Sequence, residues 1–222
     1  MYEVFETKER LSFDNTREAQ KVRASLKQKH VFLINLMASP GAGKTTTLVR
    51  LLQALKDKYR IGVMEADVDS DVDTRTIAQM GVKVIQLHTG GSCHMTADMT
   101  NRGMEKMGIE DLDIVILENI GNLVCPAEFD TGANLNLVIL SIPEGDDKPL
   151  KYPLMFQVGD VLLFNKIDTK EIFDFDEDRC KEYVRKLNPN MEFFAISAKM
   201  NQGIDQVVEN LEQRMQAWRN SL

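Results

Sequence analysis

The chain has 222 residues, with 27 lysines and arginines against 34 aspartates and glutamates, so its formal net charge is −7 at pH 7. This length fits one domain, and an acidic excess argues against a sequence-independent nucleic-acid binder, which needs a basic surface. No apolar run approaches the roughly 18–20 residues that span a bilayer, and three cysteines are too few for a disulfide framework. We therefore expect a cytoplasmic enzyme or switch with no nucleic-acid or membrane partner.

Residues 1–30 are predicted to form an N-terminal helical arm, because Val22 and Leu26 are four residues apart among basic residues. Beyond it, strands are predicted at 31–37, 61–65, 82–87, 114–118, 137–142, 161–165 and 192–196. Helices are predicted at 45–58, 74–80, 95–107, 176–187 and 204–219. This alternation predicts that residues 31–222 form one α/β domain, a doubly wound and mostly parallel sheet with helices on both faces.

A glycine-rich segment with the sequence ASPGAGKTT follows the first predicted strand at residues 38–46 and leads into a helix. Small residues let backbone N–H groups surround a phosphate, a lysine neutralises the β and γ charges, and a hydroxyl binds Mg²⁺. Ala38 replaces the first glycine of the general pattern, which alanine tolerates only at negative φ. The residues predicted to bind the nucleotide phosphates are Gly41, Ala42, Gly43, Lys44, Thr45 and Thr46.

Two later segments predict recognition of the base. Asn165, Lys166 and Asp168 end another predicted strand. A carboxylate at Asp168 can accept hydrogen bonds from guanine N1–H and its exocyclic amine, whereas adenine has an acceptor at N1 and would be rejected. The segment Ser197, Ala198 and Lys199 follows the next strand and is predicted to close over the base. The order of these motifs indicates a site for GTP and GDP.

Acidic residues at two further strand ends are candidates for catalysis and for Mg²⁺. Glu118 precedes Gly121 by three residues, a variant of the Asp-x-x-Gly pattern that senses a γ-phosphate. Acidic residues occupy every second position from Glu65 to Asp73. Asp67 lies nearest the strand end and is the candidate for a nucleotide role, and Asp69 is a weaker one. Lys44, Asp67 and Glu118 are thus the predicted catalytic residues, and Thr45, Asp67 and Glu118 the predicted Mg²⁺ ligands. A solvated turn is the alternative for the acidic stretch.

The three cysteines carry the remaining chemistry. Cys93 is followed directly by His94, and Cys125 lies seven residues past Glu118. Soft thiolate and imidazole ligands suit Ni²⁺ or Zn²⁺, although this spacing matches no familiar zinc finger and leaves ordinary small hydrophobic cysteines as an alternative. Cys180 lies in an acidic helical stretch and is expected to be a structural thiol.

Several segments taken together resemble the HypB family of SIMIBI-class P-loop GTPases, which incorporate nickel during maturation of nickel–iron hydrogenase. They read SPGAGKT from Ser39, GGSCHM from Gly90, ENIGNLVCP from Glu118 and PEGDDKPLKYP from Pro143. The resemblance implies GTP hydrolysis to GDP and phosphate, and nickel or zinc held by Cys93, His94 and Cys125.

The same resemblance implies a GTP-dependent homodimer, with Lys148 reaching the partner's guanine site. A HypA-type nickel metallochaperone and the hydrogenase large-subunit precursor are the implied partners. A UreG-like chaperone for another nickel enzyme such as urease is the alternative, although Cys125-Pro126 is followed by Ala127 where UreG has a histidine. A metal-storage scaffold without hydrolysis is a further alternative.

The ligand count also bears on assembly. Three ligands per chain cannot complete a tetrahedral site, whereas a two-fold axis supplies six. Because Glu118 and Cys125 belong to one segment that extends at most about 25 Å, a γ-phosphate that moves Glu118 is expected to move Cys125 as well.

Overall fold

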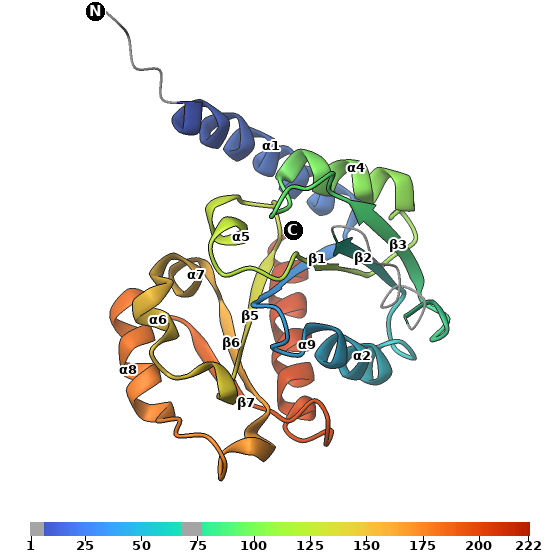
Figure 1. Cartoon of the computed structure of the whole chain (residues 1–222). Coiled ribbons are helices and arrows are strands. Elements are labelled where there is room, and N and C mark those ends of the chain that lie inside the picture. Colours follow the sequence, from blue (N-terminus) through green and yellow to red (C-terminus); the bar gives the residue numbers. More distant parts are fainter. Residues whose placement is uncertain (1–6, 68–76) are drawn as a thin grey trace, which may run out of the picture.

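The fold is a seven-stranded sheet in which every strand pairing between the described residues is parallel. This computed structural model describes residues 7–67 and 77–222 (Figure 1). The strands are β1 (Phe32–Ala38), β2 (Ile61–Asp67), β3 (Lys83–His88), β4 (Ile114–Glu118), β5 (Leu135–Ser141), β6 (Val161–Asn165) and β7 (Glu192–Ala195). Their order is β3-β2-β4-β1-β5-β6-β7, which confirms the predicted doubly wound α/β fold.

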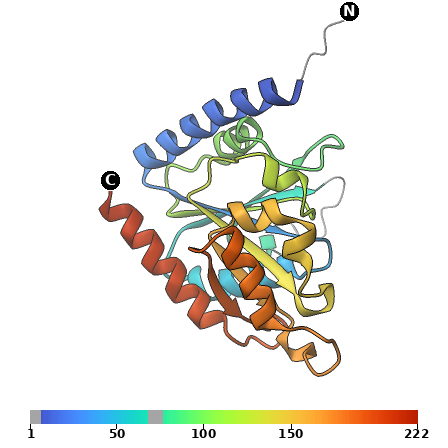
Figure 2. The ribbon, with the colours of Figure 1, turned by 90° about the vertical axis from the view of Figure 1, so that its left-hand side faces the viewer.

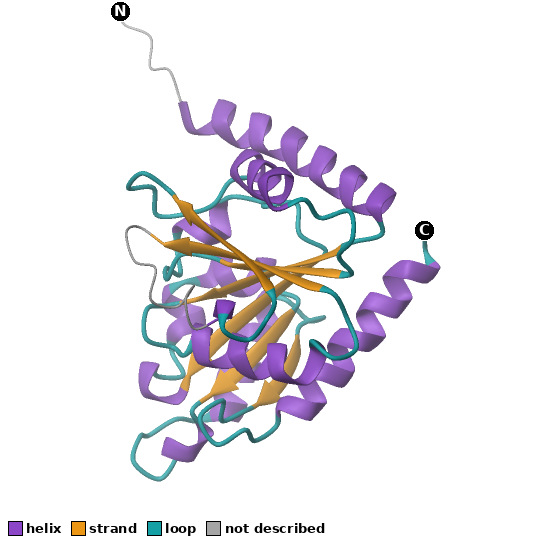
Figure 3. Ribbon diagram, turned by 90° about the vertical axis from the view of Figure 1, so that its right-hand side faces the viewer, coloured by secondary structure: helices purple, strands orange, loops and turns teal. Residues whose placement is uncertain are grey.

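Helices cover both faces of the sheet (Figure 3). The longer ones are α1 (Thr7–Lys29), α2 (Lys44–Leu55), α4 (Ala97–Met107), α8 (Glu177–Leu187) and α9 (Ile204–Asn220). Short helices α5 (Cys125–Glu128), α6 (Lys148–Lys151) and α7 (Pro153–Val158), with 3₁₀ turns at Ile142–Glu144 and Ile167–Thr169, complete the described elements. None of the helices in the described part is long and apolar enough to cross a membrane.

Alternation along the central strand explains how the layers form. Phe32, Ile34 and Leu36 point to the face covered by α2 and α9, whereas Leu33 points to the layer of α1 and α4. Met37 points to a third cluster beneath α7 and α8. Because parallel strands are buried on both faces, the whole of β1 is buried and appears in the sequence as an apolar run interrupted only by Asn35.

The predicted strands and most of the predicted helices agree with the structure to within about two residues. The predicted helix 74–80 falls partly outside the described residues. The short helices α5, α6 and α7 were not predicted, because each spans at most six residues and begins at or beside a proline. They lie over the face of β5 and β6 that α8 also covers (Figure 1).

Chain connections reverse direction at β1, since β4 lies on one side of this strand and β5 on the other. In doubly wound folds the ligand lies outside the carboxyl ends of the strands at this reversal point. The loop after β1, which is the predicted phosphate loop, occupies that position.

Candidate nucleotide and metal sites

The phosphate loop has the backbone that a phosphate cradle needs. Gly41 and Gly43 adopt positive φ of 75° and 96°, and α2 begins directly at Lys44. Ala38 still belongs to β1 and is absent from the positive-φ residues, so the alanine is compatible with this loop. The N-terminus of α2 therefore faces the loop, where backbone N–H groups and the helix dipole favour an anion.

The predicted base-recognition segment forms hydrogen bonds with the backbone of the phosphate loop. The Asn165 side chain donates to the Ala42 carbonyl at 2.9 Å, and Lys166 Nζ donates to the Gly41 carbonyl at 2.6 Å. A β-carbon at Gly43 would lie 2.5 Å from Asn165 Nδ2, so only glycine allows this approach. These contacts hold the backbone of the phosphate loop at two consecutive residues.

The predicted closing loop joins the same network. Asn165 Oδ1 accepts from the Ala198 N–H at 3.1 Å, and Asp168 Oδ1 accepts from the Ser197 hydroxyl at 2.5 Å. Ser197 and Ala198 are buried and Lys199 is exposed. The structure thus brings the 165–168 and 197–199 segments together at one edge of the sheet, as predicted.

Two residues that the sequence analysis missed support these loops. Arg50 on α2 donates to the Ala198 carbonyl at 2.8 Å and to the Lys199 carbonyl at 3.1 Å. Glu144 accepts a short hydrogen bond from the Ser39 hydroxyl and another from the Ser141 N–H at 2.7 Å. Neither carries a sequence signal for this role, because an arginine on a helix and a glutamate near a turn are common surface residues.

Carboxylates gather where Mg²⁺ would lie. The Thr45 hydroxyl donates to Glu118 Oε1 at 3.0 Å, and Glu118 is buried at the end of β4. Glu65, to which the sequence analysis gave no role, is also buried and lies beside Glu118 in the β2–β4 register. Asp67 ends β2, but its side chain lies outside the described part, as does all of Asp69. The oxygen atoms present here suit a hard cation such as Mg²⁺.

A cavity of about 680 Å³ connects these groups, within the size range of small-molecule sites. Close packing of the β4 end against the phosphate loop shapes one wall, since a β-carbon on Gly121 would lie 3.1 Å from Lys44 Nζ. Its lining comprises Pro40, Gly41, Gly43, Lys44, Thr45, Thr46, Glu65, Ala66, Glu118, Asn119, Ile120, Gly121 and Lys166.

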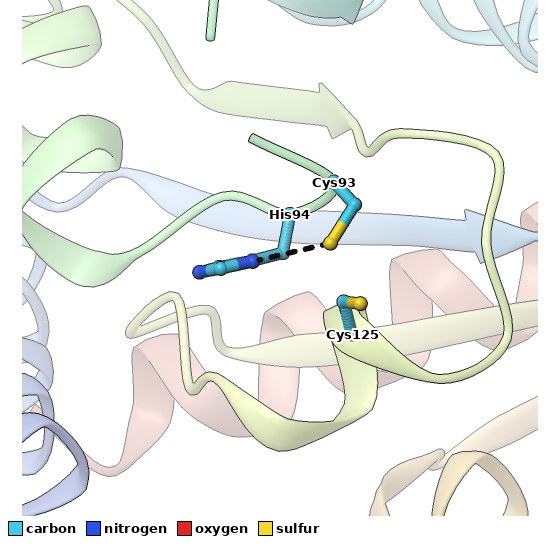
Figure 4. A group of neighbouring side chains, drawn as sticks. All are labelled: Cys93, His94 and Cys125. Carbon is cyan, nitrogen blue, oxygen red and sulfur yellow. Dashed lines mark hydrogen bonds between the residues drawn. The ribbon is translucent and has the colours of Figure 1, made fainter. Parts of the chain in front are cut away.

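A second cluster of side chains contains the three predicted soft ligands. The ligand atoms of Cys93, His94 and Cys125 all lie within 4.8 Å of one another (Figure 4). Cys93 Sγ is 3.8 Å from His94 Nδ1, and the His94 ring stacks on Phe129 with ring centroids 3.8 Å apart and planes 10° from parallel. Sulfur ligands around a tetrahedral metal lie about 3.8 Å apart, so a small inward movement would form a three-ligand site.

Protonation at this cluster follows from its neighbours. Hydrogen bonding with Cys125, with a smaller contribution from desolvation, raises the pKa of the exposed Cys93 thiol. Burial lowers the pKa of the His94 imidazole and outweighs the opposing charge of Glu128. By contrast, burial raises the pKa of Cys180 to about 12, and this residue lies on the fully buried side of α8. Cys180 therefore behaves as the expected structural thiol, apart from the cluster.

Comparison with known proteins identifies the family. Residues 32–195 match the family model described as CobW/HypB/UreG, nucleotide-binding domain. This chain belongs to that family. The hydrogenase maturation factor HypB of Escherichia coli K12 is 40% identical over 198 residues, which cover 89% of this chain and 68% of that protein. The hydrogenase/urease maturation factor HypB of Helicobacter hepaticus is 41% identical over 204 residues, covering 90% and 84% of the two chains.

Solved structures agree. HypB from Helicobacter pylori in complex with nickel superposes with a TM-score of 0.86 at 35% identity, covering 92% of this chain and 96% of that one. HypB from Archaeoglobus fulgidus superposes with a TM-score of 0.84 at 31% identity, covering 91% of this chain and 98% of that one. The signal recognition particle receptor FtsY in complex with GDP shares the fold alone, with a TM-score of 0.52 at 14% identity. The resemblance to HypB predicted from the motifs is thereby confirmed.

Proposed function

We propose that this chain is a GTP-hydrolysing metallochaperone that binds nickel, or zinc, and supports nickel insertion into nickel–iron hydrogenase. The observation that supports the proposal is that the segment 118–125 joins the nucleotide site at its first residue to the metal cluster at its last. Glu118 accepts from Thr45 of the phosphate loop, and Cys125, seven residues later, lies in the thiol–imidazole cluster. A change at the γ-phosphate therefore has a covalent route to a metal ligand.

Hydrolysis would use residues that already line the cavity. Lys44 neutralises charge on the transferring phosphoryl group, and backbone N–H groups of residues 41–46 bind the phosphate oxygens. Thr45 and Glu118, with Asp67, would hold Mg²⁺, which supplies further neutralisation of phosphate charge when bound. Asp168, fixed by Ser197, recognises guanine. Water attack on the γ-phosphorus would release phosphate and leave GDP.

The cargo metal would be held by Cys93, His94 and Cys125. Two thiolates and one imidazole match the soft ligands that Ni²⁺ and Zn²⁺ accept, and three ligands leave coordination positions open for transfer. Binding requires deprotonated thiols and a neutral imidazole, so metal uptake releases protons and strengthens as the pH rises.

A two-fold dimer would complete the metal site. Val124, next to Cys125, is 48% exposed, and Leu150 and Leu154 on α6 and α7 are 59% and 39% exposed. Helix α7 packs against both α5 and α6, so these apolar side chains belong to neighbouring elements. Apolar surface of this kind favours association with a second copy. We propose that GTP favours this dimer and that Lys148 reaches the partner's guanine site.

The proposed partners are a HypA-type nickel metallochaperone and the hydrogenase large-subunit precursor, in the cytoplasm, where reducing conditions keep Cys93 and Cys125 available as ligands. Urease is a second candidate client. It rests on the name of the Helicobacter hepaticus relative, a hydrogenase/urease maturation factor.

Titration calorimetry of Ni²⁺ and Zn²⁺ tests the proposal, with the protein bound either to GDP or to a non-hydrolysable GTP analogue. We expect different metal affinities in the two states and loss of most affinity in Cys93→Ala and Cys125→Ala. The matched control Cys180→Ala should bind metal like the wild type, because its thiol is buried away from the cluster. Equal affinity in both nucleotide states would leave a metal-binding protein without GTP control. Sedimentation with the same nucleotides tests the dimer, which a monomer in every state would refute.

A further inference from the structure

Helix α1 contacts both of the chain segments that carry the metal ligands. The Asn15 side chain accepts a hydrogen bond from the Ala97 N–H at 2.9 Å and donates one to the Asp130 carbonyl at 2.9 Å. Ala97 lies three residues after His94, and Asp130 lies five residues after Cys125. A single amide therefore joins the two segments at points close to their ligands.

A second residue of α1 fixes the Cys125 segment. Arg23 forms a two-pronged ion pair with the Asp130 carboxylate, with N–O distances of 2.9 and 2.8 Å. Asp130 Oδ1 also accepts from the Gly132 N–H at 2.8 Å. Gly132 adopts φ of +79°, and a β-carbon there would lie 2.5 Å from Val22 Cβ on α1. The chain after α5 thus lies directly against the helix, at a distance that only glycine permits.

Between these ties, the two segments touch each other through aromatic rings. Phe129 is adjacent to Asp130 and stacks on His94. The position of Phe129, and with it the orientation of the imidazole, follows from where the 129–132 segment is held. Ala19, Val22 and Leu26 of α1 are buried in the hydrophobic cluster that includes residues of α4, which fixes the position of the helix on the domain (Figure 2).

We infer that α1 holds the two segments that carry the metal ligands in place and that Asn15 is a positioning residue for these ligands. This inference rests on the proposed function, because it concerns the same three ligands. Cys93 and His94 lie on one segment and Cys125 on another. Binding of a metal ion by all three residues therefore costs the conformational entropy of ordering two segments. Asn15 and Arg23 restrict that freedom in the folded chain and raise the affinity of the three-ligand site.

Calorimetry of Ni²⁺ and Zn²⁺ with full-length Asn15→Ala tests the inference. We expect about tenfold weaker metal binding, corresponding to the loss of two hydrogen bonds, with unchanged affinity for GDP as the sign of an intact fold. Asn15→Asp keeps the acceptor for the Ala97 N–H and loses the donor to Asp130, so a smaller loss is expected. Lys29→Ala is the matched control, since Lys29 pairs with Glu110 at the other end of the same helix.

The double variant Asn15→Ala/Cys125→Ala separates a positioning role from a general loss of stability. Once Cys125 is removed, only one ligand segment remains, and Asn15→Ala should cause no further loss of affinity. The same tenfold loss in both backgrounds, or wild-type affinity in Asn15→Ala, would overturn the inference. Absence of metal binding by the wild-type protein would instead overturn the proposed function together with it.

Discussion

The nucleotide site and the metal site both follow the carboxyl ends of strands, but they are held in different ways. In the nucleotide site, residues of one motif bind the backbone of another: Asn165 contacts Ala42 and Ala198, and Arg50 contacts Ala198 and Lys199. In the metal cluster, Cys93 and His94 lie on a loop and Cys125 begins the short helix α5. Cys93 is exposed, and the contacts that hold the two segments come from α1 and the Phe129 ring.

This difference suits two kinds of ligand. A nucleotide site must present one rigid geometry to a transition state, and buried hydrogen bonds between motifs provide it. A cargo site must also release its ion, so ligands on loops with a small number of identifiable ties can be loosened at low cost. Different contacts hold the two sites, so substitutions in one site are expected to leave ligand binding at the other unchanged.

The largest effect is expected for Lys44→Ala. Hydrolysis of GTP should fall at least about 100-fold, because the lysine charge stabilises the transferring phosphoryl group. Metal affinity of the nucleotide-free variant should equal that of the wild type, since the lysine acts on the phosphates whereas the predicted metal ligands are Cys93, His94 and Cys125. Phosphate release and calorimetry measure the two quantities. A variant that loses both activities would show that the sites share one support.

Asp168→Asn should reduce the preference for guanine by roughly 100-fold, because the amide that replaces the carboxylate cannot accept from both N1–H and the exocyclic amine. Xanthine nucleotides should bind better than in the wild type, since the amide can donate to the oxygen that replaces the amine. Competition binding of GTP, XTP and ATP measures the change. Ser197→Ala removes the hydroxyl that fixes Asp168 and should reduce the guanine preference by less than Asp168→Asn does. Equal wild-type affinity for ATP and GTP would contradict the assignment.

Phe129→Leu should weaken metal binding about threefold, in line with the loss of one aromatic stacking contact. Phe129→Tyr keeps the ring and should restore affinity. In a His94→Ala background the substitution should have no effect, because the stack acts through the imidazole. Calorimetry of Zn²⁺ with the single and double variants gives the coupling. An unchanged loss without His94 would mean that Phe129 supports the loop rather than the ligand.

The smallest effect is expected for Arg50→Ala. Loss of its contacts with the Ala198 and Lys199 carbonyls should lower GDP affinity roughly threefold, because the closing loop is less well held. Gln53→Ala, which removes a neighbouring contact of the same arginine, should leave GDP affinity unchanged. Fluorescent-nucleotide titration is sensitive enough for this difference. Wild-type affinity in Arg50→Ala would show that the loop is ordered without the arginine.

The two sites also differ in how far their sequences predicted them. The phosphate loop and the 165–168 segment were found because each motif is contiguous and follows a strongly apolar strand. The fold was predictable for the same reason, since nearly continuous apolar runs such as β1 and β6 indicate strands buried on both faces. Spacing alone left the thiol cluster undecided, and the family resemblance was needed to select Cys93, His94 and Cys125.

Contacts between distant side chains could not be predicted. The position of Glu65 beside Glu118 depends on strand register, which places two residues far apart in sequence at the same level of the sheet. The contacts of Asn15 depend on where α1 packs against α4, and a polar residue on a helix surface gives no sign of its partners. Arg50 and Glu144 are similar cases.

The long sequence separation between the phosphate loop and its supports also has a consequence during synthesis. At ~5–20 residues per second, roughly 8 to 30 s separate translation of Lys44 from that of Lys199. Until Asn165 and Lys166 are translated, the nascent loop lacks the donors that later fix the carbonyls of Gly41 and Ala42. An all-parallel sheet closes only through such non-local pairings, which are slow to form. Guanine-nucleotide binding by ribosome-bound chains is thus expected only after residue 199 has left the exit tunnel, and it reports that the sheet has closed.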